Sequence, residues 1–138
     1  MENKFNDATA QRPEGERVID GALVAIDLPL FMEQIKEEAP WKESDRNAIT
    51  VFKTNGLRIV LIALHKGAEM NRHTADGIIS LQVLEGQLQF HMDRRSVQLC
   101  KGQMLALHER IPHSVLALEE TLFLLTLTTT LTVESTHL

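Results

Sequence analysis

Cysteine and long hydrophobic runs are scarce in this chain of 138 residues. Its single cysteine, Cys100, cannot form an internal disulfide, which fits a reducing compartment, so we predict a cytoplasmic protein. The longest apolar run, residues 59–64, ends at His65 and is far too short to span a bilayer. The first residues lack an apolar core behind a basic start, and this pattern predicts no secretory signal.

Basic clusters and aromatic residues are also scarce. The largest basic cluster is Arg94-Arg95, aromatic residues make up 4% of the chain, and tyrosine is absent. A nucleic-acid groove needs cations along the phosphate backbone and often rings that stack on bases, so we exclude nucleic acid as a partner. Anionic membranes are excluded for the same lack of cations. The net charge of −5 lies in residues 1–50, with eleven acidic and six basic side chains, whereas residues 51–138 hold eight of each.

The chain contains enough hydrophobic residues to form one core. Hydrophobic residues make up 43% of the chain and charged residues 24%, a composition typical of globular proteins. A chain of this length buries about two-thirds of its unfolded surface. We therefore predict one domain in three parts: residues 1–47 (an arm, a strand and a short helix packed on a barrel), residues 48–133 (the barrel) and residues 134–138 (a tail).

The N-terminal part favours one short helix. Residues 1–18 lack periodicity and predict a mobile or extended arm, and a strand can follow to residue 26. Asp27 is placed to cap a helix, and the apolar spacing after it predicts an amphipathic helix that runs to about Glu38. We expect Pro40 to end this helix.

From residue 48 onward the pattern is that of many short strands. Asn55-Gly56 predicts a two-residue hairpin turn, because both residue types tolerate a positive φ. Many short strands with turn residues between them are typical of an all-β sandwich or barrel. The expected strands are residues 48–54, 57–64, 78–84, 87–92, 96–99, 104–107, 114–118 and 122–133.

Alternation within these strands predicts which side chains face inward. Ile79, Leu81 and Val83 share one face of their strand, and Leu88 and Phe90 share one face of the next. A third set is formed by His113, Val115 and Ala117. The period alone leaves open whether this third face points into the barrel.

Two stretches resemble the motifs of the cupin family. Residues 67–73 (GAEMNRH) followed by residues 83–86 (VLEG) resemble the first motif, and residues 101–107 (KGQMLAL) followed by Ile111-Pro112-His113 resemble the second. With the strands between them, the two motifs cover about residues 57–127. The resemblance implies a small single-domain jelly-roll barrel with a central cavity, and a homodimer.

The first motif departs from the family at its metal ligands. Cupins that bind a metal supply two histidines and a glutamate from the first motif and a histidine from the second. Here His73 and His113 match, whereas Ala75 and Ile79 stand at the other two positions. Two imidazoles alone bind a divalent ion weakly. The resemblance therefore implies no strong cofactor and at most a weakly bound divalent metal.

Our first hypothesis is a cupin that binds a small molecule in the barrel cavity without a strong metal site, and the sequence favours a binding protein over an enzyme without deciding between them. In this hypothesis His73 and His113 anchor the polar part of the ligand, and an apolar wall surrounds the rest. The predicted cavity residues are His73, His113, Met70, Ile79, Leu81, Val83, Phe90 and Val115.

Three alternatives stay open. The first is a metal-dependent enzyme of dioxygenase or isomerase type, in which His65, Glu69 or His108 adds a third ligand to the two histidines. The second is a metal-free acid–base enzyme, because a neutral histidine can exchange protons near neutral pH. The third is a structural or partner-binding role for the acidic N-terminal segment.

Overall fold

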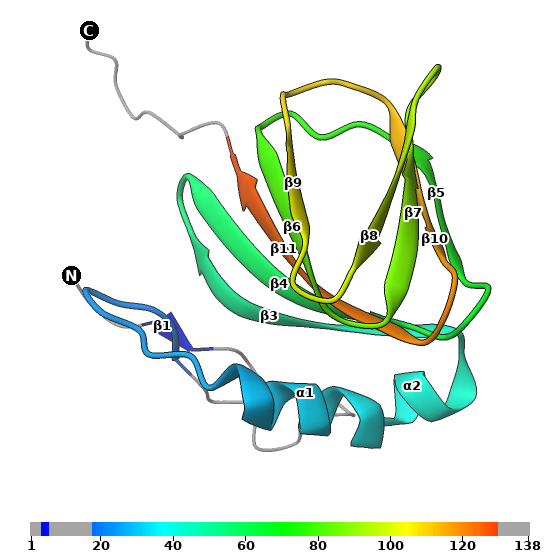
Figure 1. Cartoon of the computed structure of the whole chain (residues 1–138). Coiled ribbons are helices and arrows are strands. Elements are labelled where there is room, and N and C mark those ends of the chain that lie inside the picture. The colour runs from blue at the N-terminus through cyan, green and yellow to red at the C-terminus, as the bar shows by residue number, and fades with distance from the viewer. Residues whose placement is uncertain (1–3, 6–17, 130–138) are drawn as a thin grey trace, which may run out of the picture.

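Two antiparallel sheets face each other in the computed structural model, which describes residues 4–5 and 18–129 (Figure 1). The smaller sheet has the strand order β5 (Glu69–His73), β10 (His113–Ala117), β7 (Gln87–His91) and β8 (Ser96–Cys100). The larger sheet has the order β3 (Arg46–Thr54), β4 (Leu57–Leu64), β11 (Thr121–Thr128), β6 (Ile79–Glu85) and β9 (Met104–Leu107). The predicted all-β class and jelly-roll barrel are confirmed.

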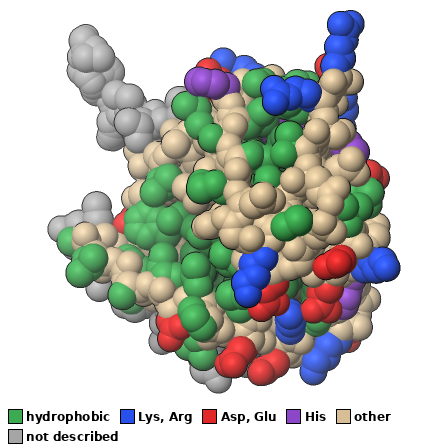
Figure 2. Space-filling view, viewed as in Figure 1, with side chains coloured by type: hydrophobic (Ala, Val, Ile, Leu, Met, Phe, Trp, Pro, Cys, Tyr) green, Lys and Arg blue, Asp and Glu red, His purple; other side chains and the backbone are tan. Residues whose placement is uncertain are grey.

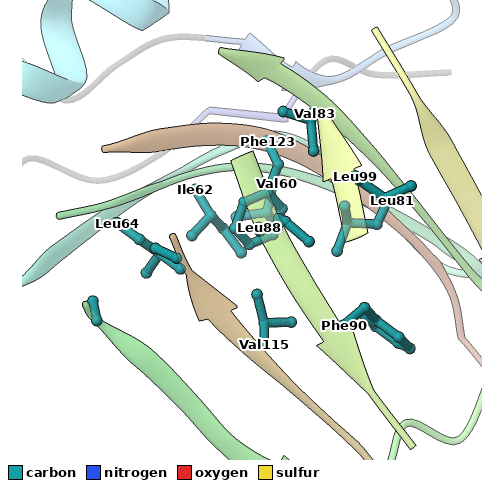
Figure 3. Packing of buried hydrophobic residues seen from close by; sticks show 12 residues of the cluster. Val60, Ile62, Leu64, Leu81, Val83, Leu88, Phe90, Leu99, Val115 and Phe123 are labelled. Carbon is teal, nitrogen blue, oxygen red and sulfur yellow. The ribbon is translucent and has the colours of Figure 1, made fainter. Parts of the chain in front are cut away.

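The main core lies between the two sheets and contains side chains from both (Figure 3). Alternation predicted the inward faces of β6 and β7 correctly, since Leu81 and Leu88 are buried in this core. Val115 of β10, whose face alternation left open, is buried there as well. The face of His113 is thereby settled, because this residue begins β10 and shares the inward face of Val115. Only 4% of His113 is exposed.

Most strand boundaries agree with the prediction to within two residues, but β5 was not predicted. Its sequence, EMNRH, contains Met70 as its one apolar residue, so no alternation is visible. The strand forms because it lies at the edge of the smaller sheet and pairs with β10. Residues 130–133, predicted to continue β11, lie outside the described residues. The predicted Asn55-Gly56 turn joins β3 and β4, and of its two residues only Gly56 takes a positive φ.

The N-terminal segment differs from the prediction at two points. Strand β2 (Val18–Asp20), which pairs with β1 (Lys4–Phe5), is shorter than expected. Helix α1 (Leu28–Glu37) begins as predicted, with the Asp27 carboxylate accepting a hydrogen bond from the Leu30 N–H at 3.2 Å. The helix also ends at Glu37, close to the predicted end. A second helix, α2 (Ala39–Glu43), was not predicted; Pro40 lies in its first turn, where the missing N–H removes no helical hydrogen bond.

The two helices pack on the outer face of the larger sheet and form a second hydrophobic cluster there. Ile35 and Trp41 contact this face, which includes Leu61. The buried Asn47 amide joins the layers, since its Nδ2 donates to the Ile35 carbonyl oxygen at 3.0 Å and to the Glu38 carboxylate at 2.9 Å. Within the described residues, no helix has the length and apolar character needed to cross a membrane.

Lys36 links helix α1 to the end of β6 and to the turn before β11. Its Nζ lies 3.2 Å from the Glu85 carboxylate and 3.0 Å from the Glu120 carboxylate. Burial lowers the pKa of Lys36, but hydrogen bonds and charge attraction from the two carboxylates outweigh it, so the pKa is raised. The ammonium group therefore stays protonated and keeps both contacts.

The connection from β6 of the larger sheet to β7 of the smaller sheet consists of a single residue, Gly86. Gly86 has a φ of +87°, in the left-handed region that favours glycine. The buried Thr121 hydroxyl holds this corner, because it accepts a hydrogen bond from the Gln87 N–H at 3.1 Å and donates to the Glu119 carbonyl oxygen at 2.8 Å.

Hydrophobic side chains also gather on the surface between helix α1 and the larger sheet (Figure 2). The large exposed hydrophobic residues include Leu23, Leu30 and Met104, of which Leu23 is 88% exposed. The homodimer that the resemblance to cupins implies stays a prediction.

Candidate functional site

A cavity of about 450 Å³ lies at the open end of the barrel, on the side away from the helices. The loop from β5 to β6 crosses this end at the top of Figure 1. The loop supplies one wall, and the rest comes from the end of β5, the starts of β6 and β10, and the end of β11. The lining residues are His73, Thr74, Ala75, Asp76, Gly77, Ile79, His113, Leu125, Leu127, Thr128 and Thr129.

His73 and His113 meet in this cavity because their strands pair. His73 ends β5, His113 begins β10, and the two residues are register partners in the antiparallel ladder. Their ring centroids are 4.4 Å apart, and the ring planes make an angle of 60°. The convergence of these two histidines, predicted from the sequence, is therefore present in the structure.

Backbone carbonyl groups determine where the proton lies on each ring. The Nδ1 of His73 is 2.7 Å from the Asn71 carbonyl oxygen, and the Nδ1 of His113 is 2.8 Å from the Ile111 carbonyl oxygen. A carbonyl oxygen can only accept, so Nδ1 must carry the hydrogen in both rings. In the neutral rings the other nitrogen, Nε2, then carries a lone pair and acts as an acceptor or a metal ligand.

The His113 ring is held on its other side by Phe90. The two rings are stacked, with centroids 5.2 Å apart and an interplanar angle of 14°. Burial lowers the pKa of His113; the hydrogen bond to Ile111 opposes this effect, and the charge of His73 adds to it. His113 is therefore neutral near pH 7, with its Nε2 available as an acceptor.

Protonation of His113 is expected to destabilise the fold. Its pKa is lowered from 6.5 in the folded protein, so the unfolded chain binds the proton more readily. The stabilising contribution is fully present above pH 6.5 and is lost as the pH falls from 6.5 through the lower folded pKa. Each unit of pKa difference corresponds to about 1.4 kcal/mol. Urea unfolding at about pH 7.5 and about pH 5 measures the loss.

The variant His113→Gln lacks this titrating group, so its unfolding free energy is expected to fall less between the two pH values than that of the unmodified protein. His73 and Asp76, which share the cavity with His113, are unchanged in this variant. The matched control is His108→Gln, because His108 is exposed and does not line the cavity. Equal losses in His113→Gln and in the unmodified protein would contradict the assignment.

The loop wall is fastened to the end of β11. The Ile78 N–H donates to the Thr128 hydroxyl at 2.8 Å, and the Thr128 N–H donates to the Ile78 carbonyl oxygen at 2.9 Å. Gly77 comes so close to Thr128 that a Cβ atom on it would lie 1.8 Å from the Thr128 carbonyl oxygen. This clasp holds Thr74, Ala75 and Asp76 over the open end of the barrel.

Of the eight predicted cavity residues, His73, His113 and Ile79 line the cavity. The other five do not line this cavity. The two sheets fill the barrel below the histidines with packed side chains, so these residues belong to the hydrophobic core or pack against it. The five are Met70, Leu81, Val83, Phe90 and Val115.

None of the three candidate third ligands joins the histidine pair. His65 lies under α2, where its Nε2–H donates to the Trp41 carbonyl oxygen at 2.8 Å and its ring stacks on the Trp41 indole. Glu69 and His73 are at opposite ends of β5, and a strand of this length extends about 13 Å. His108 is exposed and outside the cavity lining. Among the described residues, no group of three histidine, cysteine or acidic side chains could hold a metal ion.

The sequence did not reveal most of the loop wall or the contribution of β11. Leu125 and Leu127 share one face of β11, and their alternation was a signal that could have placed them at the cavity. Asp76 and Thr74 carried no comparable signal, because the clasp between Ile78 and Thr128 places them and joins residues fifty positions apart.

Comparison with known proteins identifies the fold. A conserved protein of unknown function from Streptococcus pyogenes is 26% identical, with a TM-score of 0.61, and the match covers 65% of this chain and 80% of that one. A cupin-2 domain containing protein from Shewanella frigidimarina is 17% identical, with a TM-score of 0.62 and coverage of 76% and 95%. A cupin superfamily protein from Desulfitobacterium hafniense is 13% identical, with a TM-score of 0.60 and coverage of 62% and 78%.

Sequence comparison gives less than structural comparison. No family model matches the chain, and no curated protein matches it in sequence. The structural matches share the barrel at low identity, and a shared barrel does not determine a reaction or a ligand.

Proposed function

The chain is a small cupin by its fold, and we propose that it binds a small organic molecule at the open end of the barrel. The ligand occupies the cavity of about 450 Å³ and is anchored by His73 and His113. A site without a strongly bound metal is part of the proposal.

The paired Nε2 atoms carry this proposal. Both histidines hold their Nδ1–H groups on backbone carbonyl oxygens, so Nε2 is the acceptor of each ring in its neutral form. Ile79, Leu125 and Leu127 are further residues of the lining. A few convergent polar groups beside an apolar wall are typical of small-molecule sites.

A metal-dependent enzyme is the second candidate, and one observation favours it. Metal-bound histidines commonly donate their other ring N–H to a backbone carbonyl or a carboxylate, as both histidines do here. The described residues do not complete a strong site, because two imidazoles are fewer donors than metals in proteins usually have. We therefore derive no chemical step through a metal.

Metal analysis and thermal shift together test the proposal. The purified protein is expected to contain much less than one metal ion per chain by elemental analysis. In a screen of small polar metabolites, at least one compound is expected to raise Tm, because a ligand at a hundred times its Kd stabilises the fold by about 2.7 kcal/mol.

The control is the double variant His73→Ala/His113→Ala, in which the same compound is expected to leave Tm unchanged. His91→Ala is the matched control, because His91 is a histidine outside the cavity lining and is bonded to Ser96. One metal ion per chain that is lost in the double variant would contradict the first proposal and support the enzyme. A compound that stabilises both proteins equally would place binding elsewhere.

A further inference from the structure

The cavity presents hydrogen-bond acceptors to a ligand. The Nε2 atoms of His73 and His113 accept, since their Nδ1–H groups are held by the backbone. The Thr128 hydroxyl donates to the Ile78 carbonyl oxygen at 3.2 Å, so its hydrogen is used within the protein. A ligand that hydrogen-bonds to the two Nε2 atoms therefore carries N–H or O–H donors.

The formal charge of the cavity lining is negative. Among the described lining residues, Asp76 is the one that carries a formal charge at neutral pH, and neither lysine nor arginine is present. A carboxylate or phosphate would meet the like charge of Asp76, and the lining offers no lysine or arginine to replace the water that the anion loses. A cation meets acceptors and an opposite charge.

The remaining wall sets the shape of the ligand. Ile79 is buried at the start of β6, and Leu125 and Leu127 from β11 are partly buried beside it. These side chains offer a surface for a hydrocarbon group, whereas the two histidine acceptors come from β5 and β10. The histidines and the three apolar side chains therefore come from different strands.

We infer that the cavity binds a small amphipathic amine in its protonated form. The ammonium group donates to the Nε2 atoms of His73 and His113, Asp76 supplies the opposite charge, and the hydrocarbon part packs on Ile79 and the two leucines. This inference rests on the proposed function, because it specifies the chemical class of the ligand at the same site.

Three probes of one shape test the inference: cyclohexylamine, cyclohexanol and cyclohexanecarboxylate. Each is titrated into the full chain at about pH 7.5, up to about 50 mM, and followed by two-dimensional amide NMR. The amine is expected to shift the amide signals of residues 74–77 and 125–129, and to bind about tenfold more tightly than the carboxylate. The affinity for the alcohol is expected to lie between the affinities for the amine and the carboxylate.

Asp76→Asn separates charge from shape. This variant is expected to weaken amine binding about fivefold and to leave alcohol binding unchanged, because the alcohol carries no charge. Glu109→Gln is the matched control, since Glu109 is exposed and outside the cavity lining, and it is expected to change neither affinity.

Two kinds of negative result are distinguishable. If the carboxylate binds more tightly than the amine at the same residues, or if Asp76→Asn leaves amine binding unchanged, the amine inference is overturned and the small-molecule site remains. If none of the three probes shifts the cavity signals, the proposed function is overturned together with the inference.

Discussion

Replacing Gly86 with alanine is expected to cost at least about 3 kcal/mol of unfolding free energy. A Cβ atom at this corner would lie 2.2 Å from the Glu120 carbonyl oxygen and 2.7 Å from the Thr121 hydroxyl. The first is a backbone atom that cannot rotate away, and the second belongs to the hydroxyl that holds the corner. The left-handed φ of +87° adds strain. Urea unfolding measures the difference.

Gly102→Ala is the control, because Gly102 has nearly the same φ, +86°, and a Cβ atom on it would have no neighbour within 4 Å. It is expected to cost about 1–2 kcal/mol, the contribution of the backbone conformation alone. If Gly86→Ala failed to give soluble protein while Gly102→Ala folded, the difference would still be evident. Equal losses would show that the corner relaxes around a methyl group.

Replacing Gly77 with alanine is expected to detach the loop wall of the cavity. A Cβ atom on Gly77 would lie 1.8 Å from the Thr128 carbonyl oxygen, so the loop must move away from β11. The predicted loss is about 2–4 kcal/mol of unfolding free energy. Cyclohexylamine binding measured by NMR is expected to weaken at least about tenfold, because Asp76 moves with the loop.

Thr128→Val provides the comparison for Gly77→Ala. It removes the hydroxyl, which accepts from the Ile78 N–H and donates to the Ile78 carbonyl oxygen, but keeps the bond between the Thr128 N–H and that carbonyl oxygen. A loss of about 1.5 kcal/mol is expected for these two side-chain hydrogen bonds. If the valine variant lost as much as Gly77→Ala, the hydroxyl and not the close approach of the backbones would hold the loop.

The barrel could be predicted from the sequence because its strands carry local signals. Alternation identified the inward faces of β6 and β7, and the turn residues separated the strands. Local sequence signals failed where strand pairing or the position in a helix determines the structure. The sequence EMNRH of β5 has no alternation, and it becomes a strand because β10 lies beside it. Pro40 was interpreted as a stop although proline is equally suited to the first turn of a helix, and α2 begins there.

The site was predictable in part. The meeting of His73 and His113 followed from two motifs that resemble those of cupins, and the register of β5 and β10 produces it. Alternation shows which side chains face inward but not how much space remains between them. For that reason Leu81 and Val83 were predicted in a cavity, whereas both belong to the packed core and neither lines the cavity at the open end. The loop wall depends on a contact with β11 that no local pattern reveals.

The stacking of Trp41 on His65 has a spectroscopic consequence. Trp41 is the one tryptophan of the chain, and its ring centroid lies 3.5 Å from that of His65. It belongs to α2, which lies at the end of the barrel away from the β5–β6 loop (Figure 1). Intrinsic fluorescence therefore reports the packing of the helices on the sheet and the environment of the neighbouring imidazole. The emission spectrum is not expected to change when a ligand binds at the open end.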